Sequence, residues 1–167
     1  PAPAVQCRFA QIDSQKASIN IRQLSFQHFG GASFSEAGAL MHLNSQAGSD
    51  GIEIDMQHCR ISGNSCASGP GNNGSVFYSQ GTGTQIISLN MVWMLNNSAD
   101  QGGVAYAFDG SQVEYQWTMC RIENNAADDF GGVCWGGSHN WTECIVSGNA
   151  VNQGGGVCYE GTVEWDN

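Results

Sequence analysis

Two short motifs alternate along most of this 167-residue chain, and their repetition constrains the fold more than any other feature. The first motif is apolar-x-apolar-x-x-Asn, and the second is Gly-small-apolar-x-aromatic. Complete copies of the first begin at Cys59, Val92, Cys120 and Cys144, after a degenerate copy at Leu24. Complete copies of the second begin at Gly74, Gly102, Gly131 and Gly155, after a degenerate copy at Gly38. Such repetition indicates a solenoid, in which each repeat packs on its neighbours.

The asparagines that close the first motif set the length of the repeat. Asn64 and Asn97 lie 33 residues apart, Asn97 and Asn125 lie 28 apart, and Asn125 and Asn149 lie 24 apart. A unit of about 24 residues matches a coil of a parallel β-helix or a leucine-rich repeat, whereas a propeller blade needs about 40. Neither a Leu-x-x-Leu-x-Leu pattern nor a sustained helical period occurs. The sequence therefore predicts an all-β fold, a right-handed single-stranded parallel β-helix of about five to six coils.

The repeats also predict how the chain is organised. We expect one β-helix domain over residues 1–167, with an irregular segment at 1–18, repeats at 19–162 and the start of an incomplete coil at 163–167. An uncapped end of such a stack exposes apolar side chains and unpaired backbone groups. The unit is therefore expected either to be a segment of a longer chain or to self-associate through its ends, a contact that generates open filaments.

Equivalent residues of neighbouring coils should stack about 4.8 Å apart. Within the first motif, alternation places Cys120 and Ile122 inward and Arg121 outward. An asparagine at the end of the strand can adopt the left-handed turn conformation, and its amide can hydrogen-bond to the asparagines above and below. The sequence predicts an asparagine ladder made of Asn64, Asn97, Asn125 and Asn149.

Read together, the two motifs resemble the repeats of the polymorphic outer membrane proteins of chlamydiae. Those proteins carry a Phe-x-x-Asn motif and a Gly-Gly-Ala-(Ile/Leu/Val) motif many times. The Phe position is matched by Ile61, Met94, Ile122 and Val146, and the glycine pair by Gly102-Gly103, Gly131-Gly132 and Gly155-Gly156. The resemblance covers about residues 19–162. It implies a right-handed β-helix that is displayed on a surface, in a family linked to adhesion.

Charge and composition narrow the possible partners and the location. Five basic residues against 15 acidic ones give a net charge of −10, which leaves no basic patch for nucleic acid or for an anionic membrane surface. No run of 18 apolar residues exists, so we expect no membrane insertion. Glycosylation sequons occur at Asn73, Asn96 and Asn140. Together with the seven cysteines they favour a secreted protein, extracellular or on the cell surface.

Two pairs of cysteines recur at equivalent positions of the repeat, the members of each pair 24 residues apart. Directly stacked Cα atoms about 4.8 Å apart fall within the disulfide range. Buried free thiols, which pack as small hydrophobes, are the open alternative. Cys59 stands beside Val92 of the next coil rather than beside a cysteine. The disulfide candidates are Cys120 with Cys144, Cys134 with Cys158, and Cys59 with Cys66 or Cys7.

Acidic residues offer the main candidate for a ligand site other than a glycan. Asp128 and Asp129 are the only adjacent carboxylates, and Asp100 lies in the equivalent loop one coil earlier. Solvated loop acids are the first interpretation, and a weak calcium site is the alternative. We expect no other cofactor. Polysaccharide lyases and hydrolases include β-helices, but their sites need carboxylates clustered with a base on one face, and the histidines here fall at different repeat positions.

An aromatic side chain ends each complete copy of the second motif. These residues are Tyr78, Tyr106, Trp135 and Tyr159. If the column points outward it offers a platform for sugar rings, and if it points inward it is core. Each aromatic shares a strand face with the valine of its motif, which favours inward burial.

Three classes of function follow from these observations. The first is a secreted structural protein, a β-helix subunit or segment of an extracellular filament or cell-surface stalk that is assembled end to end. A glycan- or host-binding adhesin module is the alternative. A polysaccharide lyase or hydrolase is the third class, and we expect the chain not to be an enzyme.

Overall fold

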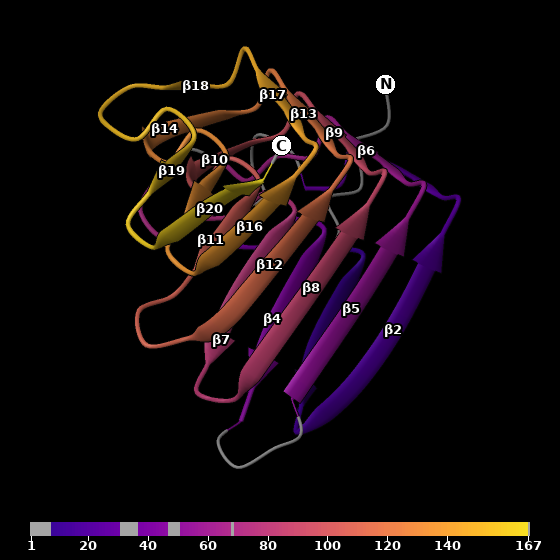
Figure 1. Ribbon diagram of the computed structural model, residues 1–167. Helices are drawn as coiled ribbons and strands as arrows, with labels where there is room; N and C mark the ends of the chain where they lie inside the picture. Colours follow the sequence, from indigo (N-terminus) through magenta and orange to yellow (C-terminus); the bar gives the residue numbers. More distant parts are fainter. Residues whose placement is uncertain (1–7, 31–36, 47–50, 68, 167) are drawn as a thin grey trace, which may run out of the picture.

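The fold is built from β-strands alone in the part of the chain that the computed structural model describes, residues 8–30, 37–46, 51–67 and 69–166. The strands form four parallel sheets (Figure 1), which confirms the all-β prediction. These residues include no helix with the length and apolar character needed to cross a membrane.

The first sheet has the order β1 (Ala10–Ser14), β4 (Met41–Ser45), β7 (Phe77–Gly81), β11 (Ala105–Ala107), β15 (Cys134–Trp135) and β19 (Cys158–Tyr159). The second has the order β2 (Lys16–Arg22), β5 (Gly51–Gln57), β8 (Thr84–Asn90), β12 (Gln112–Thr118), β16 (Ser138–Thr142) and β20 (Thr162–Asp166). The third contains β3 (Ser25–Gln27), β6 (Arg60–Ser62), β9 (Trp93–Leu95), β13 (Arg121–Glu123) and β17 (Ile145–Ser147). The fourth contains β10 (Ser98–Gln101), β14 (Ala126–Phe130) and β18 (Ala150–Val151).

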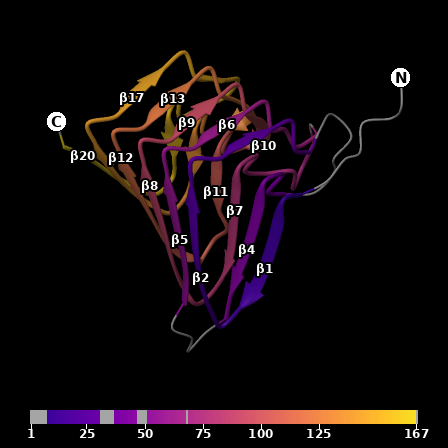
Figure 2. The same ribbon diagram turned by 90° about the vertical axis from the view of Figure 1, so that its right-hand side faces the viewer.

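Consecutive strands of the chain belong to different sheets, and we call one passage of the chain through the sheets a coil. Each coil adds at most one strand to a sheet, and the fourth sheet receives strands from three coils. The coils follow one another along one axis (Figures 1 and 2). Strand β1 pairs with β4, so regular strand structure begins at residue 10. The prediction of an irregular segment over residues 1–18 is therefore wrong for residues 10–18. Residues 1–7 lie outside the described residues. At the other end, β20 pairs with β16 and continues the stack.

One apolar cluster fills the space between the sheets. Along β12 the buried Val113, Tyr115 and Trp117 alternate with outward polar residues, as expected for a strand with one face in the core. In-register pairing then places Trp117, Trp141 and Trp165 in one column. Their rings stack with centroid separations of 4.6 and 5.1 Å. The aromatic side chains of the core therefore stack along the same axis as the coils.

Left-handed corners flank every strand of the third sheet. The residues before these strands, Gln23, His58, Met91, Met119 and Glu143, have φ between +50° and +56°. The residues after them, His28, Gly63, Asn96, Asn124 and Gly148, are also left-handed. The prediction that the ladder asparagines themselves adopt this conformation is wrong. The preceding residue makes the turn, and this turn directs the next side chain toward the interior.

A shared carbonyl acceptor interrupts strand alternation in the second motif. The backbone N–H groups of Val76 and Phe77 both donate to the carbonyl of Val104, at 2.9 Å each. The same double contact recurs one coil later, where Val104 and Ala105 both donate to Val133. Both consecutive side chains are consequently buried in the core. The aromatic residue that follows is left on the opposite face of the sheet.

Candidate functional site

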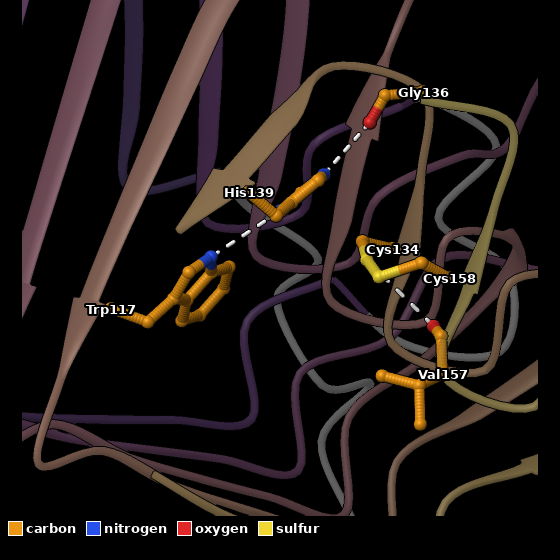
Figure 3. The surroundings of a disulfide bond; sticks show 6 residues. All are labelled: Trp117, Cys134, Gly136, His139, Val157 and Cys158. Atoms are coloured by element: carbon orange, nitrogen blue, oxygen red, sulfur yellow. Dashed lines mark hydrogen bonds between the residues drawn. A yellow bond between two sulfur atoms is a disulfide. The ribbon is translucent and has the colours of Figure 1, made fainter. Parts of the chain in front are cut away.

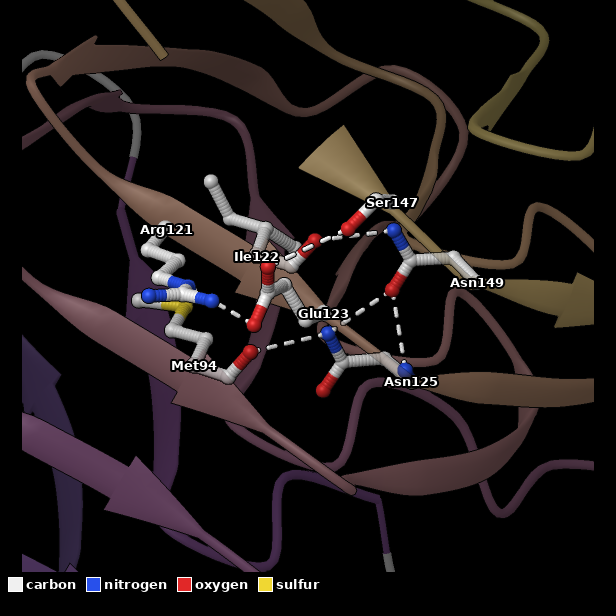
Figure 4. Close-up of polar contacts among 7 residues, drawn as sticks. All are labelled: Met94, Arg121, Ile122, Glu123, Asn125, Ser147 and Asn149. Atoms are coloured by element: carbon white, nitrogen blue, oxygen red, sulfur yellow. Dashed lines mark hydrogen bonds and ion pairs between the residues drawn. The ribbon is translucent and has the colours of Figure 1, made fainter. Parts of the chain in front are cut away.

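Hydrogen bonds join the four predicted ladder asparagines through the interior. Figure 4 shows the last of these contacts, between Asn125 and Asn149. The side-chain amides donate from Asn64 to Asn97, from Asn97 to Asn125 and from Asn125 to Asn149, at 2.9 Å each. Each accepting oxygen also takes the backbone N–H of the asparagine one coil before it. The ladder extends to the degenerate first copy, where the backbone N–H of Phe29 donates to Asn64. The ladder satisfies buried polar groups in every coil that it crosses.

The structure contains the predicted disulfide between Cys134 and Cys158, whose Cα atoms lie 4.6 Å apart (Figure 3). Cys120 and Cys144 are free thiols, so the disulfide alternative is wrong for this pair. Their Sγ atoms instead contact backbone carbonyls beside them, those of Leu89 and Trp117 among others.

Two further candidate cysteines are also free, so the proposed bond between Cys59 and Cys66 is absent. Cys66 packs against Ala39 and Ala99 in a small separate cluster. Burial raises the pKa of its thiol to about 11. Cys7, the other candidate partner of Cys59, lies outside the described residues.

The aromatic column lies on the face of the first sheet that points away from the main core, which corrects the expected inward orientation. Tyr106 stacks on Tyr78 at 5.4 Å and on Trp135 at 4.6 Å, with interplanar angles of 2° and 9°. Tyr159 stacks on Phe130 of the fourth sheet. Because both faces of the Tyr106 ring are occupied by protein, the column does not offer the sugar platform that an outward orientation implied.

The three predicted acidic residues come together on strands rather than on loops. A register shift between β10 and β14 places Asp128 and Asp129 opposite Asp100. Asp100 is 7 % exposed, and its burial, with the nearby charges of Asp129 and Asp128, raises the pKa of its carboxyl group. The side chain of Gln153 donates to Asp129 at 2.6 Å. Within the described ranges no group of His, Cys, Asp or Glu has the arrangement of a metal site.

The three sequons differ in their surroundings. Asn73 is buried, so the folded chain leaves little room for a glycan on its side chain. Asn140 is half-buried, and its amide donates to Glu114 at 3.2 Å. Asn96 is exposed at a left-handed corner. Asn96 is therefore the sequon most accessible to glycosylation.

His139 is a buried histidine for which the structure gives a packing role. Its ring lies parallel to Tyr115, with centroids 4.8 Å apart. The indole N–H of Trp117 donates to Nδ1, and Nε2 lies 2.8 Å from the carbonyl oxygen of Gly136 (Figure 3). A donor on one side and an acceptor on the other specify the neutral ring with hydrogen on Nε2. Burial accordingly lowers the pKa of His139 to about 4.

Two hollows lie on the outer faces of the sheets. The first, about 460 Å³, lies on the second sheet and is lined mainly by polar side chains, among them Ser18, Asn20, Glu53, Asp55, Ser88 and Gln116. Neighbouring coils pair these side chains, as where the hydroxyl of Ser88 donates to Gln116 at 3.2 Å. This hollow is a polar, well-solvated surface.

The second hollow, about 590 Å³, lies along the corner between the second and third sheets, and we call it the Trp93 groove. Its lining residues are Gln23, Leu24, Ser25, His58, Cys59, Arg60, Met91, Trp93 and Met119. The pairing of the third sheet places Trp93 between Arg60 and Arg121 on the neighbouring coils. The guanidinium of Arg121 lies 5.9 Å from the centre of the Trp93 ring and pairs with Glu123 at 2.7 Å. Trp93 itself is 45 % exposed.

The residues of the Trp93 groove were not predicted as a site. The signal was nevertheless present, because Arg60, Trp93 and Arg121 all occupy the outward x position of the first motif, next to inward apolar residues. What the motif could not provide was the corner geometry that brings Met91 and Met119 beside them.

No protein-family model, no curated protein and no solved structure matches this chain.

Proposed function

We propose that this chain is a right-handed, single-stranded parallel β-helix of the kind that the motif resemblance implies. We further propose that it serves as a rigid structural element of an extracellular filament or cell-surface stalk. The observation that carries the proposal is the continuity of identical interactions along one axis. The asparagine ladder and the tryptophan column each link coil to coil with nearly constant geometry. A stack built this way resists bending because every coil is held to its neighbours by the same contacts.

The outermost described coil supports assembly through the ends. Trp165 belongs to the inward column yet is 52 % exposed, whereas Trp141 beneath it is 1 % exposed. Its strand, β20, is also the edge of the second sheet. An edge strand with an exposed aromatic ring favours pairing with a further strand. We propose that a coil of a second copy covers this surface, a heterologous contact that extends the stack into a filament.

The disulfide supports the extracellular part of the proposal. Bonds such as that between Cys134 and Cys158 persist in oxidising compartments and are rare in the cytosol. Exposed Asn96 would then be open to glycosylation in the secretory pathway. The proposal assigns no reaction and no cofactor to the chain.

Sedimentation velocity over a wide range of protein concentrations tests the structural proposal. We expect larger, elongated species to grow with concentration and to disappear in Trp165→Arg, which places a charge on the exposed ring position. Trp93→Arg is the matched control, because Trp93 is similarly exposed but lies on the side of the stack rather than at its end. A single compact monomer at every concentration, or association that survives Trp165→Arg, would refute assembly through this surface.

Glycan binding remains the second candidate, and the polar hollow on the second sheet is the observation that favours it. Hydroxyl, amide and carboxylate groups repeat there from coil to coil, and they suit the hydroxyl groups of an extended sugar chain. A glycan array with wild-type protein and Asp55→Ala tests this candidate. Binding that is absent, or that Asp55→Ala leaves unchanged, argues against the hollow as a glycan site.

A further inference from the structure

The Trp93 groove brings exposed apolar side chains together with cationic ones, on a molecule whose net charge is −10. Leu24, Met91, Trp93 and Met119 are all large apolar residues with more than a third of their surface exposed. They gather in one groove along the corner of the second and third sheets. Exposed apolar residues that are scattered singly need no explanation, but a contiguous set of them marks an interaction surface.

The corner positions that carry the two methionines are costly ones for such residues. Met91 and Met119 have φ of +53° and +50°, where L-residues other than asparagine or glycine are strained by about 1 kcal/mol. At the other left-handed corner the chain uses Gly63 and Gly148 in two of its coils. Exposed methionine side chains add no core packing that offsets this strain. They do add flexible apolar surface, which adapts to the shape of a bound side chain.

Cationic groups flank the groove within a chain of net charge −10. Arg60 is exposed, and no acceptor among the described residues pairs with its guanidinium. Arg121 stands on the other side of Trp93, partly neutralised by Glu123. Since the chain holds only five lysines and arginines, two of them beside one exposed tryptophan create a local positive field.

We propose that the Trp93 groove binds an acidic peptide segment of a partner protein, with a large apolar side chain of that segment seated on Trp93, Met91 and Met119. A carboxylate of the same segment pairs with Arg60. Tryptophan, arginine and methionine are the residues enriched in protein interfaces, and the first two dominate their binding energy. The proposal is independent of the assembly proposed above, because the groove lies on the side of the stack.

Other occupants fit the groove less well. Two copies that met groove to groove would bring four arginines together, which like-charge repulsion disfavours. A sugar ring would need hydrogen-bonding partners for its hydroxyl groups, whereas the surface that the groove exposes is mainly apolar. Long anionic polymers would meet the acidic remainder of the molecule, whereas a short acidic segment meets mainly the local charge.

Selection from a displayed library of random short peptides against the immobilised, intact protein tests the proposal. We expect enriched peptides to carry Asp or Glu close to Leu, Phe or Trp, and their binding to weaken as salt rises. Trp93→Ala and Arg60→Glu should each weaken binding about tenfold or more. Phe108→Ala and Lys16→Glu are the matched controls, because they remove an exposed aromatic ring and reverse an exposed charge outside the groove. Circular dichroism verifies that every variant is folded.

Three outcomes would overturn the proposal. The first is that no peptide is enriched, or that the enriched peptides lack acidic residues. The second is that Trp93→Ala and Arg60→Glu bind the selected peptides as tightly as the two controls do. The third is a glycan array in which wild-type protein binds a sugar, Trp93→Ala does not, and no peptide competes; the groove would then be a glycan site.

Discussion

The buried middle of the asparagine ladder provides the most direct test of how the coils are held together. Asn125 is fully buried, and its side chain joins three coils. Its Oδ1 accepts the backbone N–H of Asn97 at 3.0 Å, and its Nδ2 donates to the carbonyl of Met94 at 3.0 Å and to Asn149 at 2.9 Å. Asn125→Leu removes these bonds while keeping a side chain of similar size.

The expected loss follows from these contacts. The orphaned backbone N–H of Asn97 should cost about 2 kcal/mol. The two bonds donated by Asn125, and the bond that its Oδ1 accepts from the side-chain amide of Asn97, should cost about 1 kcal/mol each. The apolar contacts of leucine should return about 1 kcal/mol. We therefore expect Asn125→Leu to lower the free energy of unfolding by about 4 kcal/mol. The same substitution at Asn149, which is half-buried, should cost only about 1 kcal/mol, because water can reach the groups left without partners.

Guanidinium chloride unfolding, followed by the fluorescence of the buried Trp117 and Trp141, measures both variants. The slope of the free energy against denaturant should stay at the wild-type value, so that midpoint shifts report stability alone. A loss below about 1 kcal/mol for Asn125→Leu, or equal losses for Asn125→Leu and Asn149→Leu, would refute the view that buried ladder bonds stabilise the stack.

Further predictions concern a glycine pair, the disulfide and the buried histidine. Gly103→Ala should destabilise the fold by about 3 kcal/mol in chemical denaturation, because its Cβ would collide with the backbone carbonyl oxygens of Gly132 and Ala126. Gly156→Ala, at the equivalent repeat position with nothing within 4 Å, should be nearly neutral, and similar losses for both variants would contradict this reasoning. Replacing Cys134 and Cys158 by serine should cost about 3 kcal/mol, seen as a lower melting temperature that no longer responds to reductant. The pKa of His139 is lowered in the folded state, so its contribution is present above about pH 6.5 and should be lost as pH falls toward 4; His139→Gln should flatten that part of the stability profile.

Much of the fold follows from the two sequence motifs alone. Their spacing identifies which residues are equivalent, and strand alternation identifies Ile122 as buried and Arg121 as exposed, as the structure has them. Equivalence in sequence then becomes pairing in space, as Cys134 with Cys158 or Trp141 with Trp165. The asparagine ladder could be predicted for the same reason, since a buried amide that recurs once per coil finds a hydrogen-bonding partner in the equivalent amide of the next coil.

Where local backbone geometry breaks the alternation, the sequence misleads. The shared carbonyl of Val104 places Val76 and Phe77 on the same side, so the aromatic that follows points away from the core. Two cysteine pairs with identical spacing also differ in the structure, a difference that their spacing does not reveal. The thiols of Cys120 and Cys144 contact carbonyls close to the corner, whereas Cys134 and Cys158 are joined across adjacent strands.

The sequence by itself determined the repeat, its length, the strand-rich architecture and the columns of equivalent residues, because all of these depend only on periodicity. Only the tertiary structure decided which face each column presents and what lies beside it. The Trp93 groove illustrates the difference: Met91 and Met119 belong to one column and Trp93 to another. Left-handed corners turn the two columns toward one hollow, and that turn is a property of φ at single residues, which no repeat pattern reveals.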